Sequence, residues 1–289
     1  MYDEMLKHLD SQGLFFLILA IILMPLNWLV EALKWQLVLQ PIRPSGLWWA
    51  VKSVCAGVSI GIFMPNRIGE FTGKILLLPQ KYRLRAGMAA ILTSIAQFAA
   101  SVAIGAVALL LYLLHFGSFD HSNLLLSISA ILILILVLSI AYFSLPYLFR
   151  KIGKLSWTSG RAKLQAVLSV STSYHRRELI LLWLLAAFRY LIFSFQFVFL
   201  LYAMGIDAAW IMLWILVAST LLLQSLIPVP AMIALGIRFS AAIYFIGQIS
   251  GNEFGIIAAS AMLWIINLIV PALAGLIFIN RTKIWERSS

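Results

Sequence analysis

A polar stretch interrupts the apolar sequence at residues 63–80, FMPNRIGEFTGKILLLPQ. It carries prolines, glycines and ionisable side chains where a lipid-facing helix would carry leucines. Irregular backbone at membrane depth is tolerated only where it lines a cavity or is buried in protein, and ionisable residues there mark functional sites. This stretch is therefore the first candidate site, and its candidate residues are Pro65, Asn66, Arg67, Gly69, Glu70 and Lys74.

A second interrupted stretch follows at residues 226–247, LIPVPAMIALGIRFSAAIYFIG. It places Pro228, Gly236 and Arg238 after an apolar run. Two interrupted hydrophobic segments, one in each half of a chain, point to the binding site of a transporter. We predict two interrupted helix pairs and leave an inverted repeat open. Each pair either re-enters from one side of the membrane or makes two short crossings.

These residues suit an anionic ligand. Arginine makes bidentate contacts to phosphate, and helix N-termini after Pro65 and Pro230 would add backbone N–H donors. Arg189 and Gln196, inside a further apolar segment, extend the set. A phospholipid or polyprenyl-phosphate headgroup fits this chemistry. The predicted ligand-binding set is Pro65, Asn66, Arg67, Gly69, Glu70, Lys74, Arg189, Gln196, Pro228, Gly236 and Arg238.

Each of these residues also has a structural interpretation. Arg67 and Glu70, three residues apart, would form a bridge that holds the loop. Glu70 is either a proton carrier or the partner of Arg67 or Lys74. We favour pairing, because a lone carboxylate in hydrocarbon is so unfavourable.

Enzymatic motifs are absent from the sequence. The four histidines lie at loops or span ends without metal-ligand spacing, and there is no nucleophile elbow, Walker loop or dinucleotide fingerprint. We expect no catalytic residue, no metal, no cofactor and no enzyme activity. Cys55, the single cysteine, is expected to be a packing residue.

Composition indicates an all-α, polytopic membrane protein. Of the 289 residues 63% are hydrophobic and 11% charged, against roughly 25% charged in soluble domains. We expect a single membrane domain over residues 1–289, with a first half at about 1–148, a basic loop at 149–178 and a second half at about 179–289. Self-association stays open.

Hydropathy places the helices. We expect long spans at residues 13–39, 88–114, 124–147, 179–204, 210–227 and 256–279, with shorter pieces at 47–64, 73–78 and 241–248. The stretch QKYRLRAG, residues 80–87, is expected to be a loop, and Pro25 a kink. Glu31 and Lys34 share one helix face; an ion pair at a helix end and a site role are equally open.

The net charge of +11 is explained by membrane topology rather than by nucleic acid binding. Three short loops carry Asp120, Asp207 and Glu253 without lysine or arginine, whereas cations gather near residues 43, 81–85, 150–177 and 281–287. This alternation predicts an outside N-terminus and a cytoplasmic C-terminus. Residues 150–177 form either a basic amphipathic helix on the membrane surface or a solvated loop.

At four places the chain resembles the transmembrane region of lysylphosphatidylglycerol synthases, a flippase-like membrane family. The matching pieces are NWLVEALKW at 27–35, MPNRIGE at 64–70 with Lys74 and Leu77, FRYLIFSFQ at 188–196 and IPVPAMIALGIRFS at 227–240.

The resemblance implies a lipid-translocating domain, with members linked to aminoacylated phospholipids or polyprenyl-linked glycans. Pro65, Arg67, Gly69 and Glu70 match its first motif, and Pro228, Gly236 and Arg238 its second. Ile233, Ala234 and Phe239 stand where the family usually has two glycines and a glutamate. No aminoacyl-transferase domain follows, so lysyl-lipid synthesis is not implied.

Two functions follow as hypotheses. The first is a lipid flippase of the bacterial inner membrane that binds an anionic phospholipid or polyprenyl-phosphate headgroup through Arg67 and Arg238. The alternative is a non-transporting scaffold whose partner is a lipid-modifying or glycosyl-transferring enzyme, docked on the basic stretch 150–177.

Overall fold

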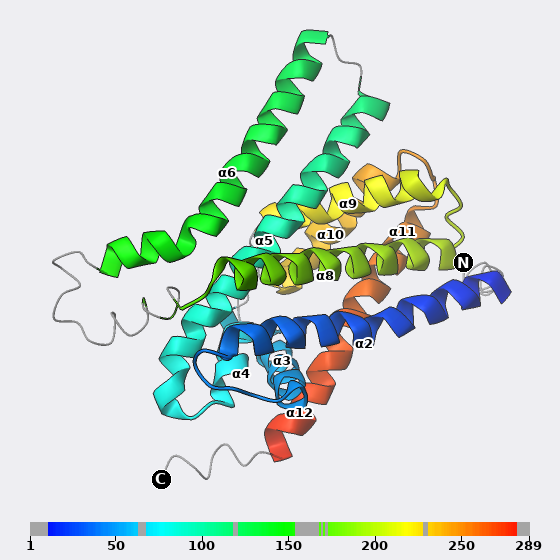
Figure 1. Ribbon diagram of the computed structural model, residues 1–289. Coiled ribbons are helices and arrows are strands. Elements are labelled where there is room, and N and C mark those ends of the chain that lie inside the picture. Colours follow the sequence, from blue (N-terminus) through cyan, green and yellow to red (C-terminus); the bar gives the residue numbers. More distant parts are fainter. Residues whose placement is uncertain are drawn as a thin grey trace. The chain divides into compact units, whose positions relative to one another are not determined.

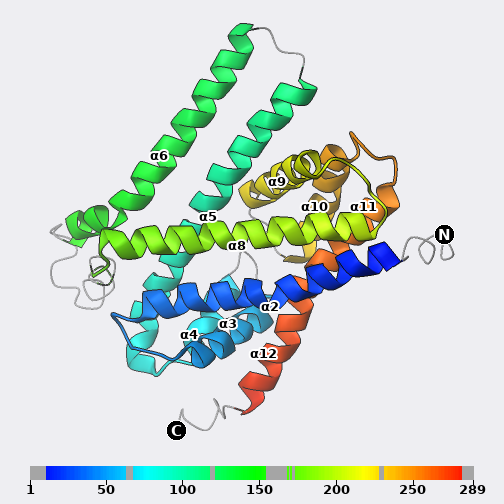
Figure 2. The same cartoon turned by 45° about the vertical axis from the view of Figure 1, so that its right-hand side comes forward.

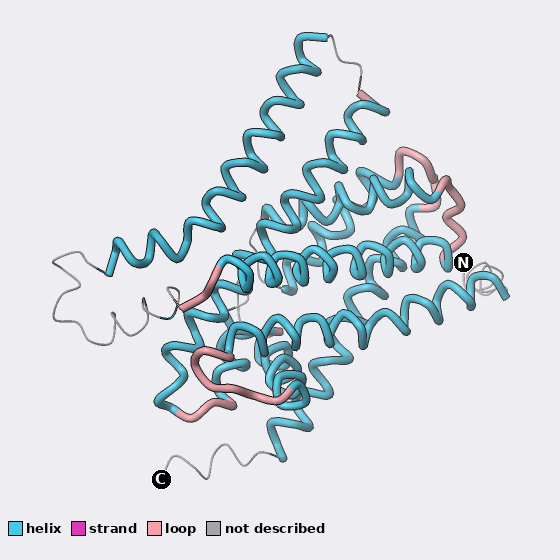
Figure 3. Tube along the Cα trace, viewed as in Figure 1, coloured by secondary structure: helices cyan, strands magenta, loops and turns pink. Residues whose placement is uncertain are grey.

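The computed structural model describes residues 11–62, 68–117, 121–153, 168, 170, 173–227 and 231–281. Every regular element within these ranges is a helix (Figure 3). Five helical stretches are long and apolar enough to cross a membrane. The all-α, polytopic class predicted from composition is confirmed.

The long helices are α2 (Ser11–Leu39), α5 (Gln80–Phe116), α6 (His121–Gly153) and α8 (Arg176–Ala203) (Figure 1). A fifth stretch joins α11 (Glu253–Trp264), a π-helical turn η2 (Ile265–Ile269) and α12 (Val270–Arg281). Pro271 has no N–H to continue the regular ladder, which accounts for an irregular turn just before it.

The start of α5 corrects one sequence-based expectation. Residues 80–87, expected to be a loop, are the first two turns of this helix. Pro79 stands immediately before the first helical residue, where its missing N–H costs nothing. Arg83 Nε donates to the Leu78 carbonyl at 2.9 Å and Arg83 Nη2 to the Leu76 carbonyl at 3.2 Å. The basic residues here therefore complete the carbonyl end of the preceding helix.

Short helices occupy the two interrupted segments. The first contains α3 (Leu47–Gly61) and α4 (Ile68–Leu76), so the predicted half-helix at 73–78 begins five residues earlier. The second contains α9 (Trp210–Leu226) and α10 (Ala231–Ile246). The members of each pair pack on one another, and the two views show them side by side (Figures 1 and 2). At 1.5 Å per residue α4 measures about 14 Å, too short to span a membrane.

The chain forms two compact units that do not follow its first and second halves. The first unit contains Met1–Asn27, Ser101–Ile135 and Arg189–Val270, and the second contains Trp28–Ala100, Leu136–Phe188 and Pro271–Ser289. The α9–α10 pair belongs to the first unit and the α3–α4 pair to the second. An inverted repeat, re-entry and the single domain stay predictions.

The first unit packs around the apolar face of α9. Leu213, Leu216 and Ala218 are buried there. The Tyr190 hydroxyl donates to the Ala218 carbonyl at 3.0 Å, and Gln196 Nε2 donates to the Ala20 carbonyl at 2.9 Å. These bonds connect α8 to α9 and to α2 in an interior that offers no water.

The second unit depends on close backbone approach between α3 and α4. A Cβ at Gly73 would lie 2.5 Å from the Ala56 carbonyl oxygen and from Gly57 Cα, and a Cβ at Gly57 would lie 2.7 Å from the Glu70 carbonyl oxygen. Ser59 Oγ donates to the Ala272 carbonyl of α12 at 2.6 Å. Small residues thus let α3 touch both neighbours, as at other membrane helix interfaces.

We expect Gly73→Ala to destabilise the protein by about 1–3 kcal/mol, because its new Cβ would press on backbone that cannot move aside. Gly87→Ala is the matched control. Gly87 is helical in α5 with nothing within 4 Å of its Cβ position, so alanine there should add about 0.5–1 kcal/mol. Thermal unfolding in detergent measures both, and equal midpoints would contradict the close contact.

Candidate functional site

Four charged side chains meet inside the second unit and form one network. Glu31 and Lys34 come from α2, and Glu70 and Lys74 from α4. We call these four residues the charge quartet. Lys74 Nζ lies 2.7 Å from Glu31 Oε1 and 2.8 Å from Glu70 Oε1, and Lys34 Nζ lies 2.8 Å from Glu31 Oε2. Glu31 therefore bridges two lysines, and Lys74 bridges two carboxylates.

Local helix geometry places the charges. Glu31 and Lys34 are three residues apart, and Glu70 and Lys74 four apart, so each pair shares a helix face. The glycines of the α3–α4 contact bring α4 to its place. Ser53 on α3 then holds the backbone of α4: its Oγ donates to the Lys74 carbonyl at 2.8 Å and accepts from Trp35 Nε1 at 3.0 Å.

Gln97 connects the quartet to two further helices. Lys34 Nζ donates to Gln97 Oε1 at 2.7 Å. Gln97 Nε2 in turn donates to the Ala186 carbonyl of α8 at 3.1 Å. The network therefore runs through α2, α4, α5 and α8 without leaving the second unit.

Burial makes the charge balance of the quartet important. The side chains of Lys34, Lys74 and Glu31 are 1%, 2% and 6% exposed, and that of Glu70 is 25% exposed. Two cations and two anions sum to zero. In a low-dielectric interior each charge needs a counter-charge and hydrogen bonds to offset its lost hydration. Glu70 is the member of the quartet that solvent or a ligand can reach.

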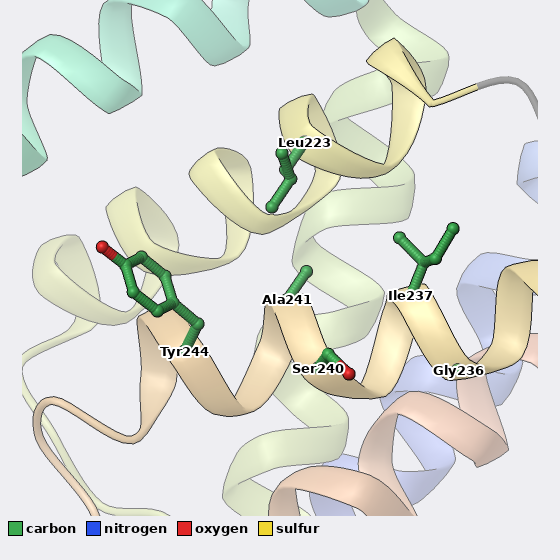
Figure 4. Close-up of a pocket in the computed structure, with 6 residues that line it drawn as sticks. All are labelled: Leu223, Gly236, Ile237, Ser240, Ala241 and Tyr244. Atoms are coloured by element: carbon green, nitrogen blue, oxygen red, sulfur yellow. The ribbon is translucent and has the colours of Figure 1, made fainter.

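A second feature lies in the first unit, on the α9–α10 pair. An open, mainly apolar groove runs between these helices (Figure 4). In the close-up Leu223 of α9 faces Ala241 and Ile237 of α10, and Gly236 leaves room at one end. Ser240 and Tyr244 supply its hydroxyl groups. Such a lining suits a hydrocarbon chain with a few polar contacts.

Family comparison was made for the whole chain. The family model described as "Lysylphosphatidylglycerol synthase TM region" matches residues 2–275. The chain belongs to this family. A comparison with curated proteins found no match. Membership in the lysylphosphatidylglycerol synthase TM-region family places the chain among membrane-embedded proteins of lipid metabolism or transport.

The predicted ligand residues of this family member fall into separate groups. Pro65, Asn66, Arg67 and Pro228 lie outside the described residues. Gly69 is in the first turn of α4, which also carries Glu70 and Lys74 in the second unit. Gly236 and Arg238 are on α10 in the first unit, together with Arg189 and Gln196 on α8.

The groups differ in what their side chains contact. The predicted pairing of Glu70 is confirmed, with Lys74 as its partner. Gln196 is fully buried and holds α2 through its bond to Ala20, while Arg189 and Arg238 are half-buried. Gly236 lines the groove of Figure 4. Ligand contact by any of these residues stays a prediction.

Sequence reasoning found only part of the quartet. The Glu31–Lys34 pair was foreseen as an ion pair three residues apart, and it forms. Its extension to Lys74, and the link from Lys34 to Gln97, were not foreseen. The available signal was charge arithmetic: α2 and α4 each place one acidic and one basic residue within an apolar stretch.

We expect Glu31→Gln to destabilise the protein by about 3–5 kcal/mol, because it leaves two buried lysines with one carboxylate. The double variant Glu31→Gln/Lys34→Met should regain part of this loss, since one lysine and one carboxylate then remain. Glu253→Gln, at an exposed helix start, is the control. Denaturation in detergent gives the ranking; a double variant less stable than Glu31→Gln would refute charge balance as the cause.

Proposed function

We propose that the chain is a lipid transporter of the bacterial inner membrane that binds an anionic lipid headgroup and is not an enzyme. The observation that carries the proposal is the charge quartet. It puts a buried lysine, capped by a partly exposed carboxylate, on a helix too short to span a membrane. Polar groups kept at such cost inside apolar helices mark substrate pathways in membrane proteins.

The nature of the polar groups supports transport rather than chemistry. The described residues of the two interrupted segments offer lysine, arginine, glutamate and hydroxyl groups. No group of three or more histidine, cysteine or acidic residues suited to a metal occurs in the described ranges. Lysine and arginine bind phosphate oxygens, and the groove on α9 and α10 suits an apolar chain. Family membership agrees with a lipid substrate.

Helix ends support the proposed orientation. The described lysines and arginines at helix ends, namely Arg43, Lys81, Arg83, Arg85, Arg150, Lys151, Arg176, Arg177 and Arg281, all belong to the second unit. The opposite ends of α5, α6 and α8 belong to the first unit, whose described lysine and arginine residues are Arg189 and Arg238 alone. By the positive-inside rule we assign the basic ends to the cytoplasm.

Orientation is tested by labelling single cysteines in a Cys55→Ala background, which removes the natural thiol. Gln248 and Lys151 are both exposed, at ends of α10 and α6 that belong to different units. We expect a membrane-impermeant maleimide to label Gln248→Cys in intact cells and Lys151→Cys only after permeabilisation. The reverse result would invert the assignment.

Lipid binding is tested by native mass spectrometry of the purified protein with its co-purified lipids. We expect the wild type to retain an anionic phospholipid or polyprenyl phosphate, and Arg67→Ala and Arg238→Ala to lose it. Lys151→Ala, which removes an exposed cation near the end of α6, is the matched control. Retention in both arginine variants, with loss in the control, would favour the scaffold function.

A further inference from the structure

The two carboxylates that hold Lys74 are not equivalent. Glu31 accepts from two lysines and is almost fully buried. Glu70 caps Lys74 from the more exposed side, at 2.8 Å. A proton arriving from water reaches Glu70 first, and a proton on Glu31 would weaken two ion pairs rather than one. Glu70 is therefore the member of the quartet suited to exchange protons.

Charge balance connects such a proton to an anion. The quartet is neutral, so an added phosphate monoanion would leave one uncompensated negative charge in a low-dielectric site. That state is costly unless a positive charge enters with it. A proton on Glu70 supplies this charge, and it also weakens the grip of Glu70 on Lys74 Nζ.

We propose that Glu70 is a proton-binding site that gates Lys74, so that one proton is bound with each anionic headgroup. The proton comes from water and is carried on a Glu70 carboxylate oxygen. Lys74 Nζ then exchanges this oxygen for a phosphate oxygen of the lipid and keeps its bond to Glu31. This inference rests on the proposed function and adds its energy coupling.

The groups around Glu70 determine how this site titrates. Lys74 on α4 faces it directly, and Glu31 and Lys34 on α2 act on it through Lys74. Gln97 on α5 is neutral. On α3 the neighbours of Glu70 are Gly57 and Gly61, and the α3 cation Lys52 lies over the Trp48 ring instead, 5.5 Å from its centroid. Arg67 precedes Glu70 by three residues and lies outside the described residues.

The test measures headgroup binding against pH for the full chain in detergent. The probe is short-chain phosphatidylglycerol, followed by calorimetry between about pH 5 and pH 8, a range in which glutamate groups in proteins can titrate. Short-chain phosphatidylcholine, which is zwitterionic, is the matched lipid. For one coupled proton the wild-type affinity should fall up to about tenfold per pH unit as the pH rises.

Variants separate the proton site from the anion site. Glu70→Gln imitates the protonated carboxyl, so it should bind phosphatidylglycerol tightly at every pH. Glu70→Gln/Lys74→Met keeps the Glu31–Lys34 pair balanced but removes the cation, so it should not bind at any pH. Glu253→Gln should keep the wild-type slope. Binding of phosphatidylglycerol with the same pH slope in wild type and Glu70→Gln would overturn the inference and leave the proposed function standing.

A parallel series with farnesyl phosphate distinguishes the two lipid classes. Because a phosphomonoester itself titrates near pH 6, the quantity compared is the difference in slope between wild type and Glu70→Gln. Stronger binding of one probe names the headgroup, a diester or a monoester. Failure of wild type to prefer either anionic probe over phosphatidylcholine would overturn the proposed function together with the inference.

Discussion

Lys74 is the residue on which the second unit depends. Its ammonium group is held by carboxylates from two helices, and its backbone carbonyl by Ser53 of a third. A buried lysine is tolerated only with this degree of compensation. The compensation requires α4 to touch α3, which requires glycine at positions 57 and 73. Electrostatics and backbone packing are thus one constraint, because neither the ion pairs nor the close contact can form without the other.

The two interrupted segments have the same plan but different chemistry. Both are short helix pairs, but the α3–α4 pair carries Glu70 and Lys74, whereas the described part of α9–α10 carries Arg238 and no carboxylate. Phe239 stands where related chains usually have a glutamate. Acid–base function in this chain therefore falls to the first segment, and the second contributes an apolar groove and an arginine. This asymmetry is the reason to assign proton binding to α4.

Membrane topology and site chemistry draw on different cations. Arginines and lysines at helix ends have a headgroup region or water within reach, so they report orientation. Lys34 and Lys74 lie inside the packed helices with carboxylate partners, so orientation does not explain them. This separation turns a net charge of +11, which alone says little about function, into two distinct statements.

The sequence by itself determined the helical membrane class, the family, the positions of the two interrupted segments and the two short-range pairs Glu31–Lys34 and Glu70–Lys74. These follow from hydropathy and helical spacing, which act within one segment. Some local features escaped it: the first turns of α5 were taken for a loop, because arginine and lysine next to a proline resemble a loop until Arg83 is seen to bind the end of α4.

Only the tertiary structure decided that the two pairs are one network. Glu31 and Lys74 are separated by 43 residues, and Lys34 and Gln97 by 63. No periodicity connects positions so far apart. Their meeting depends on glycine contacts between α3 and α4 and on how α2, α5 and α8 pack around them. In a water-poor interior, packing determines which charges neutralise one another.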